Sequence, residues 1–124
     1  MAVVGVGVDV VDVGRLGRVL ARTPGVAVRV FAAGERSYAG DSGEVSVRRL
    51  AARYAAKEAA AKALGSPARA RWRDIEVVVG EGGRPALLVT GRTAELAATA
   101  GIRSWHVSLT HDGGVAVAVV VAES

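Results

Sequence analysis

An acid and a base spaced four residues apart are the first candidates for chemistry in this sequence. They are Glu58 and Lys62, in the alanine-rich segment LAARYAAKEAAAKALG that begins at Leu50. Side chains four apart on a helix share a face, so a carboxylate and an amine would project together from a face lined with alanine. Such a face can approach another element closely and bind a ligand there. The alternative is an exposed ion pair, which contributes roughly 0.2–0.5 kcal/mol.

A second carboxylate, Asp9, ends the apolar stretch of residues 3–8. A carboxylate at the end of a buried strand is costly unless it has a partner. Mg²⁺ is one such partner, because it prefers carboxylate and phosphate oxygens. The alternative is a strand-end or helix-capping acid, a role that suits Asp12 better than Asp9.

The sequence does not support a dinucleotide-binding loop, a histidine metal pair or a serine-hydrolase motif. The start GVGVDVVDVG lacks the third glycine of a dinucleotide-binding loop, since Val10 stands there. In WHVSLTHDGG the alternation of a strand points His106 and His111 to opposite faces, so they do not form a metal pair. The sequence has no G-x-S-x-G elbow of a serine hydrolase. His111 is either a strand-end residue beside a turn or a phosphate contact and proton carrier.

Length and composition fit one globular domain, which we place at residues 1–124. The chain has no cysteine, which excludes disulfides and makes a zinc site improbable. Its formal net charge of +4 suits an anionic partner, although solubility alone could explain the charge. The apolar N-terminus has no basic region, so it does not predict a signal peptide. We expect a cytoplasmic protein without a membrane span.

Hydrophobic periodicity and turn residues predict a mixed α and β order. We expect a helix after Asp12 that carries Arg15, Arg18 and Arg22 along one side, where they could dock an acidic helix. Ser46 is the expected N-cap of the long helix. The last four strands form hairpins, which favours an α+β domain with a largely antiparallel sheet packed on the long helix. The expected strands are 3–9, 74–79, 86–90, 105–110 and 115–122; the expected helices are 13–22, 47–64 and 93–100; 26–31 is left open, and 34–44 is a loop with a short helix.

Taken in order, these segments resemble the small, single-domain holo-[acyl-carrier-protein] synthases, a class of 4′-phosphopantetheinyl transferases. Residues 5–11 fit that family's G-x-G-x-D-[IV]-x strand, and residues 52–65 fit its R-[FY]-A-x-K-E-A-x-x-K-A-[LF]-G motif. Phe31 and Glu35 fit its F-x-x-x-E, and residues 106–111 fit its closing strand. The match covers essentially the whole chain. One departure is Gly65-Ser66-Pro67, where the family often has G-T-G near the nucleotide.

The resemblance implies a function and a set of roles. The enzyme would transfer 4′-phosphopantetheine from coenzyme A to a serine of an acyl-carrier protein of fatty-acid or polyketide synthesis. Asp9 and Glu58 would hold Mg²⁺, with Lys62 and His111 completing the catalytic set, and Arg15 and Arg22 would dock the carrier protein. The family also implies a homotrimer with active sites at subunit interfaces. The implied contacts to coenzyme A are Arg53, Lys57, Lys62, Gly65, Ser66, Pro85 and His111.

Two other functions stay open from the sequence. A non-catalytic basic module for nucleic acid or an acidic protein would explain the charge, but not Asp9 or Glu58. A Mg²⁺-dependent hydrolase would use the same carboxylates with water as the nucleophile. The transferase interpretation expects no nucleic-acid or membrane partner. It leaves the general base open between Glu58, a bound water and His111.

Overall fold

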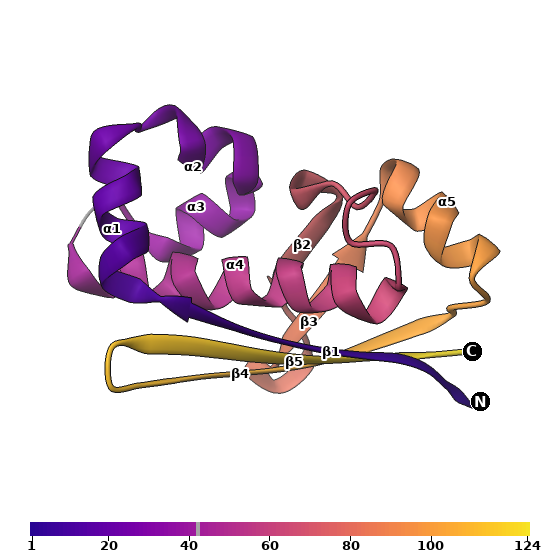
Figure 1. Cartoon of the computed structure of the whole chain (residues 1–124). Coiled ribbons are helices and arrows are strands. Elements are labelled where there is room, and N and C mark those ends of the chain that lie inside the picture. Colours follow the sequence, from indigo (N-terminus) through magenta and orange to yellow (C-terminus); the bar gives the residue numbers. More distant parts are fainter. Residues whose placement is uncertain (42) are drawn as a thin grey trace.

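A computed structural model describes residues 1–41 and 43–124 of the chain (Figure 1). Helices and strands alternate irregularly, as the sequence predicts for an α+β protein. Two short 3₁₀ turns, η1 (Trp72–Asp74) and η2 (Glu81–Gly83), complete the path. The elements in chain order are β1 (Val3–Asp12), α1 (Val13–Arg22), α2 (Gly25–Val30), α3 (Ala33–Ala39), α4 (Glu44–Leu64), β2 (Ile75–Val79), β3 (Pro85–Val89), α5 (Gly91–Thr99), β4 (Ser104–Asp112) and β5 (Val115–Glu123).

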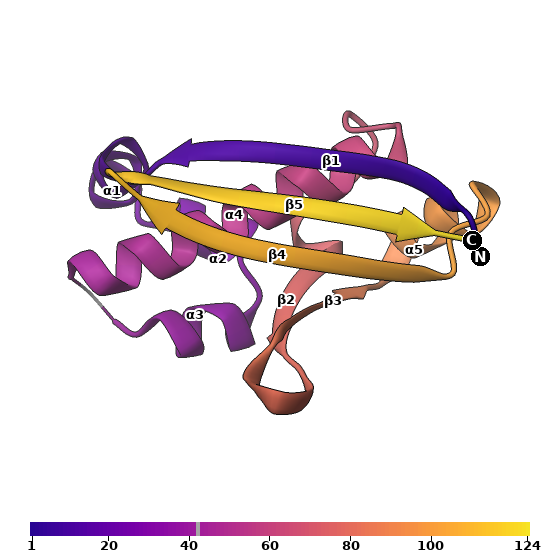
Figure 2. The ribbon, with the colours of Figure 1, turned by 90° about the horizontal axis from the view of Figure 1, so that it is seen from below.

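Two antiparallel sheets organise the fold. The larger sheet has the order β1-β5-β4, so the last strand lies in its centre, and β2 pairs with β3 in a second sheet. Helix α4 runs along one face of the larger sheet, with the short helices α1 to α3 gathered at one end and α5 near the other (Figures 1 and 2). The expected α+β fold, with antiparallel strands on a long central helix, is confirmed.

The contact between β1 and α4 is unusually close. The inner face of β1 carries Gly5 and Gly7, and these glycines lie against the backbone of α4 at Ala63 and Ala59. A methyl group on either glycine would overlap an α4 carbonyl oxygen. Helix α4 is also buried on most sides, which explains why its sequence is dense in alanine rather than clearly amphipathic. Small side chains therefore set the separation of strand and helix.

Of the two predicted helix caps, one is present in the structure and one is not. Asp12 does cap α1, because its Oδ1 accepts a hydrogen bond of 2.8 Å from the backbone N–H of Arg15. Ser46 is not the N-cap of α4, and that prediction is wrong. The helix begins at Glu44 after Gly43, whose φ of 97° favours glycine. Ser46 lies inside the helix, and its hydroxyl donates to the Gly40 carbonyl at 2.9 Å.

The segment left open in the sequence, 26–31, is mostly helical and belongs to α2. The region expected to be a loop with a short helix contains α3, while Ser42 lies outside the described residues. Among the described residues, no helix is long and apolar enough to cross a membrane.

Gly7→Ala tests the close approach of β1 and α4. The added methyl meets backbone atoms, which cannot move aside as a side chain would, so we expect the free energy of unfolding to fall by about 3 kcal/mol or more. Gly25→Ala is the matched control, because nothing lies within 4 Å of its added methyl. Urea denaturation followed by circular dichroism measures both. Equal midpoints for the two variants would show that the strand can move away without cost.

Candidate active site

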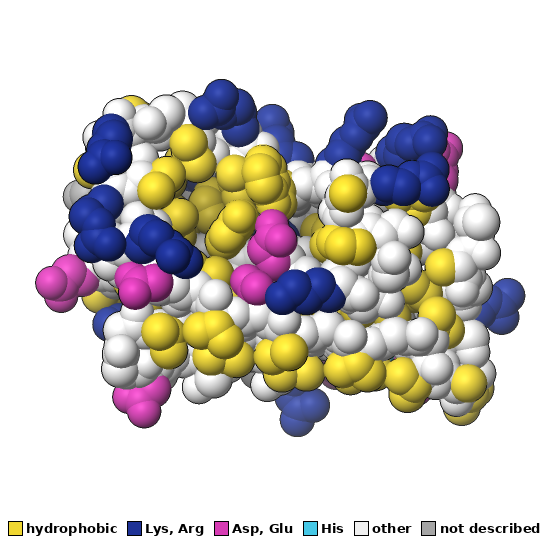
Figure 3. Space-filling view, viewed as in Figure 1, with side chains coloured by type: hydrophobic (Ala, Val, Ile, Leu, Met, Phe, Trp, Pro, Cys, Tyr) yellow, Lys and Arg dark blue, Asp and Glu magenta, His cyan; other side chains and the backbone are white. Residues whose placement is uncertain are grey.

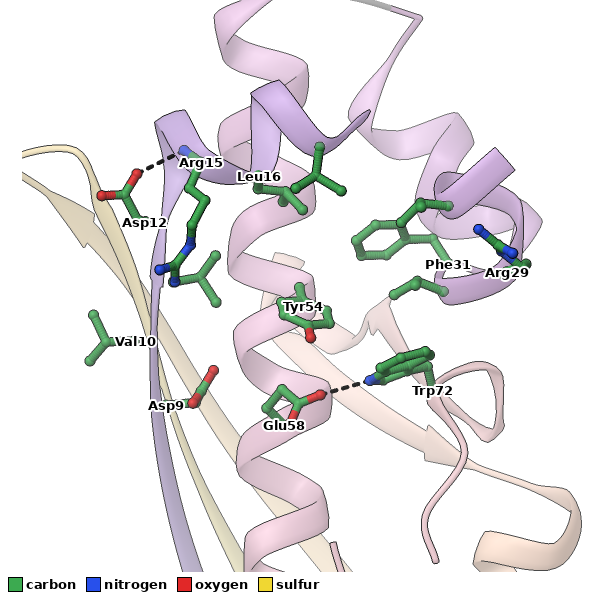
Figure 4. A pocket seen from close by; sticks show the side chains of 14 residues that line it. Asp9, Val10, Asp12, Arg15, Leu16, Arg29, Phe31, Tyr54, Glu58 and Trp72 are labelled. Carbon is green, nitrogen blue, oxygen red and sulfur yellow. Dashed lines mark hydrogen bonds between the residues drawn. The ribbon is translucent and has the colours of Figure 1, made fainter. Parts of the chain in front are cut away.

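Two carboxylates from different elements face one hollow. Asp9 comes from β1 and Glu58 from α4, and both line a cavity of about 620 Å³ (Figure 4). The cavity extends under α1 and α2, where Leu16, Val30 and Phe31 make its wall apolar. Figure 3 shows the recess lined by hydrophobic side chains, with acidic and basic side chains at its edge. Asp9 and Glu58, which were predicted separately from the sequence, therefore line the same cavity.

Lys62 joins this group through Asp9. Its Nζ lies 3.0 Å from Asp9 Oδ1 and donates a second hydrogen bond of 3.0 Å to the Val8 carbonyl. The spacing of Glu58 and Lys62 suggested an ion pair within the helix, but the observed partner of Lys62 is on the neighbouring strand. The Lys62 side chain is 49% exposed, so its ammonium can also reach an incoming anion.

Glu58 has neighbours that the sequence reasoning missed. Its Oε1 accepts a hydrogen bond of 2.7 Å from the indole Nε1–H of Trp72 (Figure 4). The ring of Tyr54, one turn earlier on α4, lies beside both residues (Figure 4). Burial raises the pKa of Tyr54, and the negative charge of Glu58 raises it further. Trp72 lies 14 residues beyond Glu58 in the chain, so no local pattern could have linked the two.

The donor set fits a hard divalent cation. Asp9 and Glu58 offer carboxylate oxygens, and no cluster of three or more His, Cys, Asp or Glu side chains forms in the described part of the chain. A site with two protein carboxylates suits Mg²⁺, which keeps several water or phosphate ligands. Zinc would need more nitrogen or sulfur ligands than this hollow provides.

Lys57 and Glu35 form an ion pair inside the protein. Both side chains are fully buried, and Lys57 Nζ lies 2.6 Å from Glu35 Oε1. The same amine donates to the carbonyl of Trp72 at 2.9 Å and to the carbonyl of Ile75. Burial lowers the pKa of Lys57, while the adjacent carboxylate of Glu35 opposes that fall.

The buried pair is fully hydrogen-bonded on the acid side as well. Glu35 Oε1 accepts from the backbone N–H of Ala32 and Oε2 accepts from that of Val77, both at 2.9 Å. The structure therefore places Lys57 in the core and not at the hollow, although the sequence grouped it with the coenzyme A contacts. In this position it joins α4 to α3, η1 and β2, because each of these three contributes a partner.

Other predicted contacts lie apart from the two carboxylates. Arg53 is buried on another side of α4, with its guanidinium 4.0 Å from the centre of the Tyr38 ring. Pro85 begins β3, and His111 lies near the end of β4, where it lines a separate hollow together with Arg48. Within one chain, Arg53, Pro85 and His111 do not line the hollow of Asp9 and Glu58.

Of the remaining predicted residues, only Arg15 lines the hollow. Gly65 ends α4 with a φ of 83°, and Ser66 follows it. Arg15 and Arg22 are exposed on α1, and Arg15 lines the same hollow as Glu58. Arg29 of α2 lines it too and was not singled out from the sequence.

The chain is similar to proteins of known family over essentially its whole length. A family model described as the 4′-phosphopantetheinyl transferase superfamily matches residues 5–120. A holo-[acyl-carrier-protein] synthase of Frankia casuarinae is 62% identical over 124 residues, which cover 100% of both chains. The crystal structure of the Neisseria meningitidis holo-[acyl-carrier-protein] synthase superposes with a TM-score of 0.89 at 28% identity, over 99% of this chain and 100% of that one. A Bacillus anthracis synthase in complex with CoA (3′,5′-ADP) has a TM-score of 0.80 at 31% identity, over 98% and 97% of the two chains.

Lys57→Met tests whether the buried ion pair of Lys57 with Glu35 stabilises the fold. The variant leaves the Glu35 carboxylate buried without its cation, so we expect the free energy of unfolding to fall by about 3–5 kcal/mol. Lys62→Met is the matched control on the same helix. Its amine is half exposed, so the loss should stay within about 1 kcal/mol. Thermal and urea unfolding of both variants measure the difference, and similar losses would contradict the assignment.

Proposed function

The chain belongs to the 4′-phosphopantetheinyl transferase superfamily, and we propose that it acts as a holo-[acyl-carrier-protein] synthase whose Mg²⁺ is held by Asp9 and Glu58. The reaction moves 4′-phosphopantetheine from coenzyme A to a serine hydroxyl of an apo acyl-carrier protein and releases 3′,5′-ADP. The observation that carries the metal assignment is the meeting of Asp9 and Glu58 at one hollow, with Lys62 against Asp9.

The chemistry explains why these residue types are needed. The serine oxygen forms a bond to the β-phosphorus of coenzyme A as the bond between this phosphorus and the bridging oxygen breaks. Such transfers depend on alignment and on neutralising charge more than on covalent help. When bound, Mg²⁺ supplies most of that neutralisation at the pyrophosphate. Lys62 adds a mobile cation, because its half-exposed ammonium can move from Asp9 to a phosphate oxygen.

The carrier protein is proposed to dock on α1. Arg15 and Arg22 are exposed there, and Arg15 also lines the hollow of Glu58. A basic surface attracts an acidic helix and fixes its orientation. The serine of a carrier bound in this way would lie close to the carboxylates.

We also propose a homotrimer with shared active sites. The outer face of β1 exposes a row of valines, Val4, Val6, Val8 and Val10, at 42–60% of their area, and Val119 of β5 continues it at 40%. Hydrophobic side chains follow the lower edge of the molecule in Figure 3. A contiguous exposed apolar surface of this kind is typical of a protein interface.

The trimer would also complete the site. The expected coenzyme A contacts Arg53, Pro85 and His111 do not reach the hollow of Asp9 and Glu58 within one chain. A neighbouring copy packed against the valine row would supply Pro85 and His111, whereas Arg53 is buried against Tyr38 in its own chain. The expected contacts to one ligand lie in two separate places on the chain. They can surround that ligand only if two copies meet, so the active site would lie at a subunit interface.

Glu58→Gln tests the function and the metal assignment together. The amide keeps the shape of the side chain and its hydrogen-bond acceptor but loses the charge, so we expect transfer to fall by about 100-fold or more with an unchanged unfolding midpoint. Glu95→Gln, an exposed residue of α5, is the control and should keep full activity. Intact mass spectrometry of apo acyl-carrier protein incubated with enzyme, coenzyme A and Mg²⁺ measures the added phosphopantetheinyl group.

The outcomes of this assay separate the alternatives. Addition that stops with EDTA supports the proposal, and near-normal activity of Glu58→Gln would remove the metal assignment. Release of a 3′,5′-ADP product without any carrier would indicate a hydrolase. Folded enzyme with no addition to any carrier, together with Mg²⁺-independent and salt-sensitive nucleic-acid binding, would favour a basic binding module.

Val6→Lys tests the trimer. A charge in the centre of the valine row cannot be buried without a partner, so the variant should run as a single chain of 12.6 kDa where the parent runs as three. Val28→Lys on α2 is the control, since Val28 is 48% exposed and lies away from the row. Size-exclusion chromatography with light scattering measures the masses. A Val6→Lys variant that stays trimeric would place the interface elsewhere.

A further inference from the structure

We propose that Trp72 is a positioning residue for Glu58. Its indole N–H donates a hydrogen bond of 2.7 Å to Oε1 and holds the carboxylate toward the hollow shared with Asp9. The inference rests on the proposed function, because it assigns Trp72 a part in presenting a catalytic acid. Neither the motifs nor the charge pattern of the sequence single out this residue.

The bond is suited to orienting a carboxylate. A hydrogen bond to an ionised acceptor is shorter and about twice as strong as one between neutral groups. A carboxylate has lone pairs on both oxygens, so a bond to Oε1 leaves capacity for a cation. Without it, Glu58 would be free to adopt other rotamers at a partly exposed position, and binding a metal would have to restrict that freedom.

Trp72 is itself held by the residue that precedes Glu58. Lys57 Nζ donates to the Trp72 carbonyl at 2.9 Å, while Glu58 accepts from the Trp72 side chain. Consecutive residues of α4 therefore hold one tryptophan by its backbone and by its indole. The Tyr54 ring lies 6.2 Å from the Trp72 ring at an angle of 50°, which limits movement of the indole further.

The contacts continue into the core. Lys57 is fixed by Glu35, and Glu35 is fixed by the backbone of β2. The buried ion pair thus holds the backbone of the 3₁₀ turn from which the exposed indole projects. Phenylalanine at this position would fill most of the same space but would offer no donor, so the N–H can be tested separately from the ring.

Nuclear magnetic resonance tests the hydrogen bond directly. The chain has two tryptophans, Trp72 and Trp105, so a ¹H–¹⁵N spectrum contains two indole signals. We expect the Trp72 proton to move upfield in Glu58→Gln and further in Glu58→Ala, because the acceptor first loses its charge and is then removed. Mg²⁺ with coenzyme A should move the signal in the parent enzyme, while the Trp105 signal stays in place.

Kinetics test the consequence for function. Trp72→Phe should raise the Mg²⁺ concentration needed for half-maximal transfer by about tenfold, lower kcat, and leave the KM for the carrier protein near that of the parent. Trp105→Phe on β4 is the matched control and should behave as the parent. Signals of both tryptophans are assigned from these two variants, and either one alone is sufficient if the other does not fold.

The results separate this inference from the proposed function. An indole signal of Trp72 that ignores both Glu58 variants would overturn the positioning role. So would a Trp72→Phe enzyme with the Mg²⁺ dependence of the Trp105→Phe control. In either case a Glu58→Gln enzyme that is still inactive would leave the proposed function standing. Full activity of Glu58→Gln would instead remove the assignment of Glu58 on which both depend.

Discussion

The close approach of β1 to α4 is the constraint on which the site depends. Gly5 and Gly7 let the strand lie against the helix backbone at Ala63 and Ala59, where larger side chains would overlap carbonyl oxygens. Asp9 follows on the same face of the strand. The distance set by the glycines therefore also decides that Asp9 meets Lys62, one turn beyond Glu58. If larger side chains separated β1 from α4, the carboxylates of Asp9 and Glu58 would lie farther apart.

A buried ion pair supplies the second anchor. Lys57 and Glu35 are fully buried, and a pair of this kind contributes little stability compared with well-packed apolar residues. The pair instead fixes the positions of the surrounding segments relative to α4. Its carboxylate and amine together bind backbone groups at Ala32, Trp72, Ile75 and Val77. Thus α4 carries charged residues with different tasks. Lys57 arranges the core, while Glu58 lines the hollow and Lys62 pairs with Asp9.

Most elements of the fold could be predicted from periodicity and turn residues, but some side-chain positions could not. Lys57 and Lys62 lie in the same alanine-rich segment, and a helix buried on most sides gives no polar face to tell them apart. Ser46 resembles an N-cap, yet the preceding glycine begins the helix earlier and the hydroxyl binds Gly40. The contact of Trp72 with Glu58 joins an irregular turn to a helix, and it follows from tertiary packing alone.

The junction of β1 and α1 fixes the position of Arg15 relative to Asp9. Asp12 is the last residue of the strand and the N-cap of the helix, so no loop separates the two elements. Its carboxylate binds the backbone N–H of Arg15, which fixes the first turn of α1 relative to the strand that carries Asp9. An acidic helix bound at Arg15 would therefore have a defined position relative to the carboxylates. Proximity of this kind accounts for much of the rate of a two-substrate reaction, because alignment is set before the bonds change.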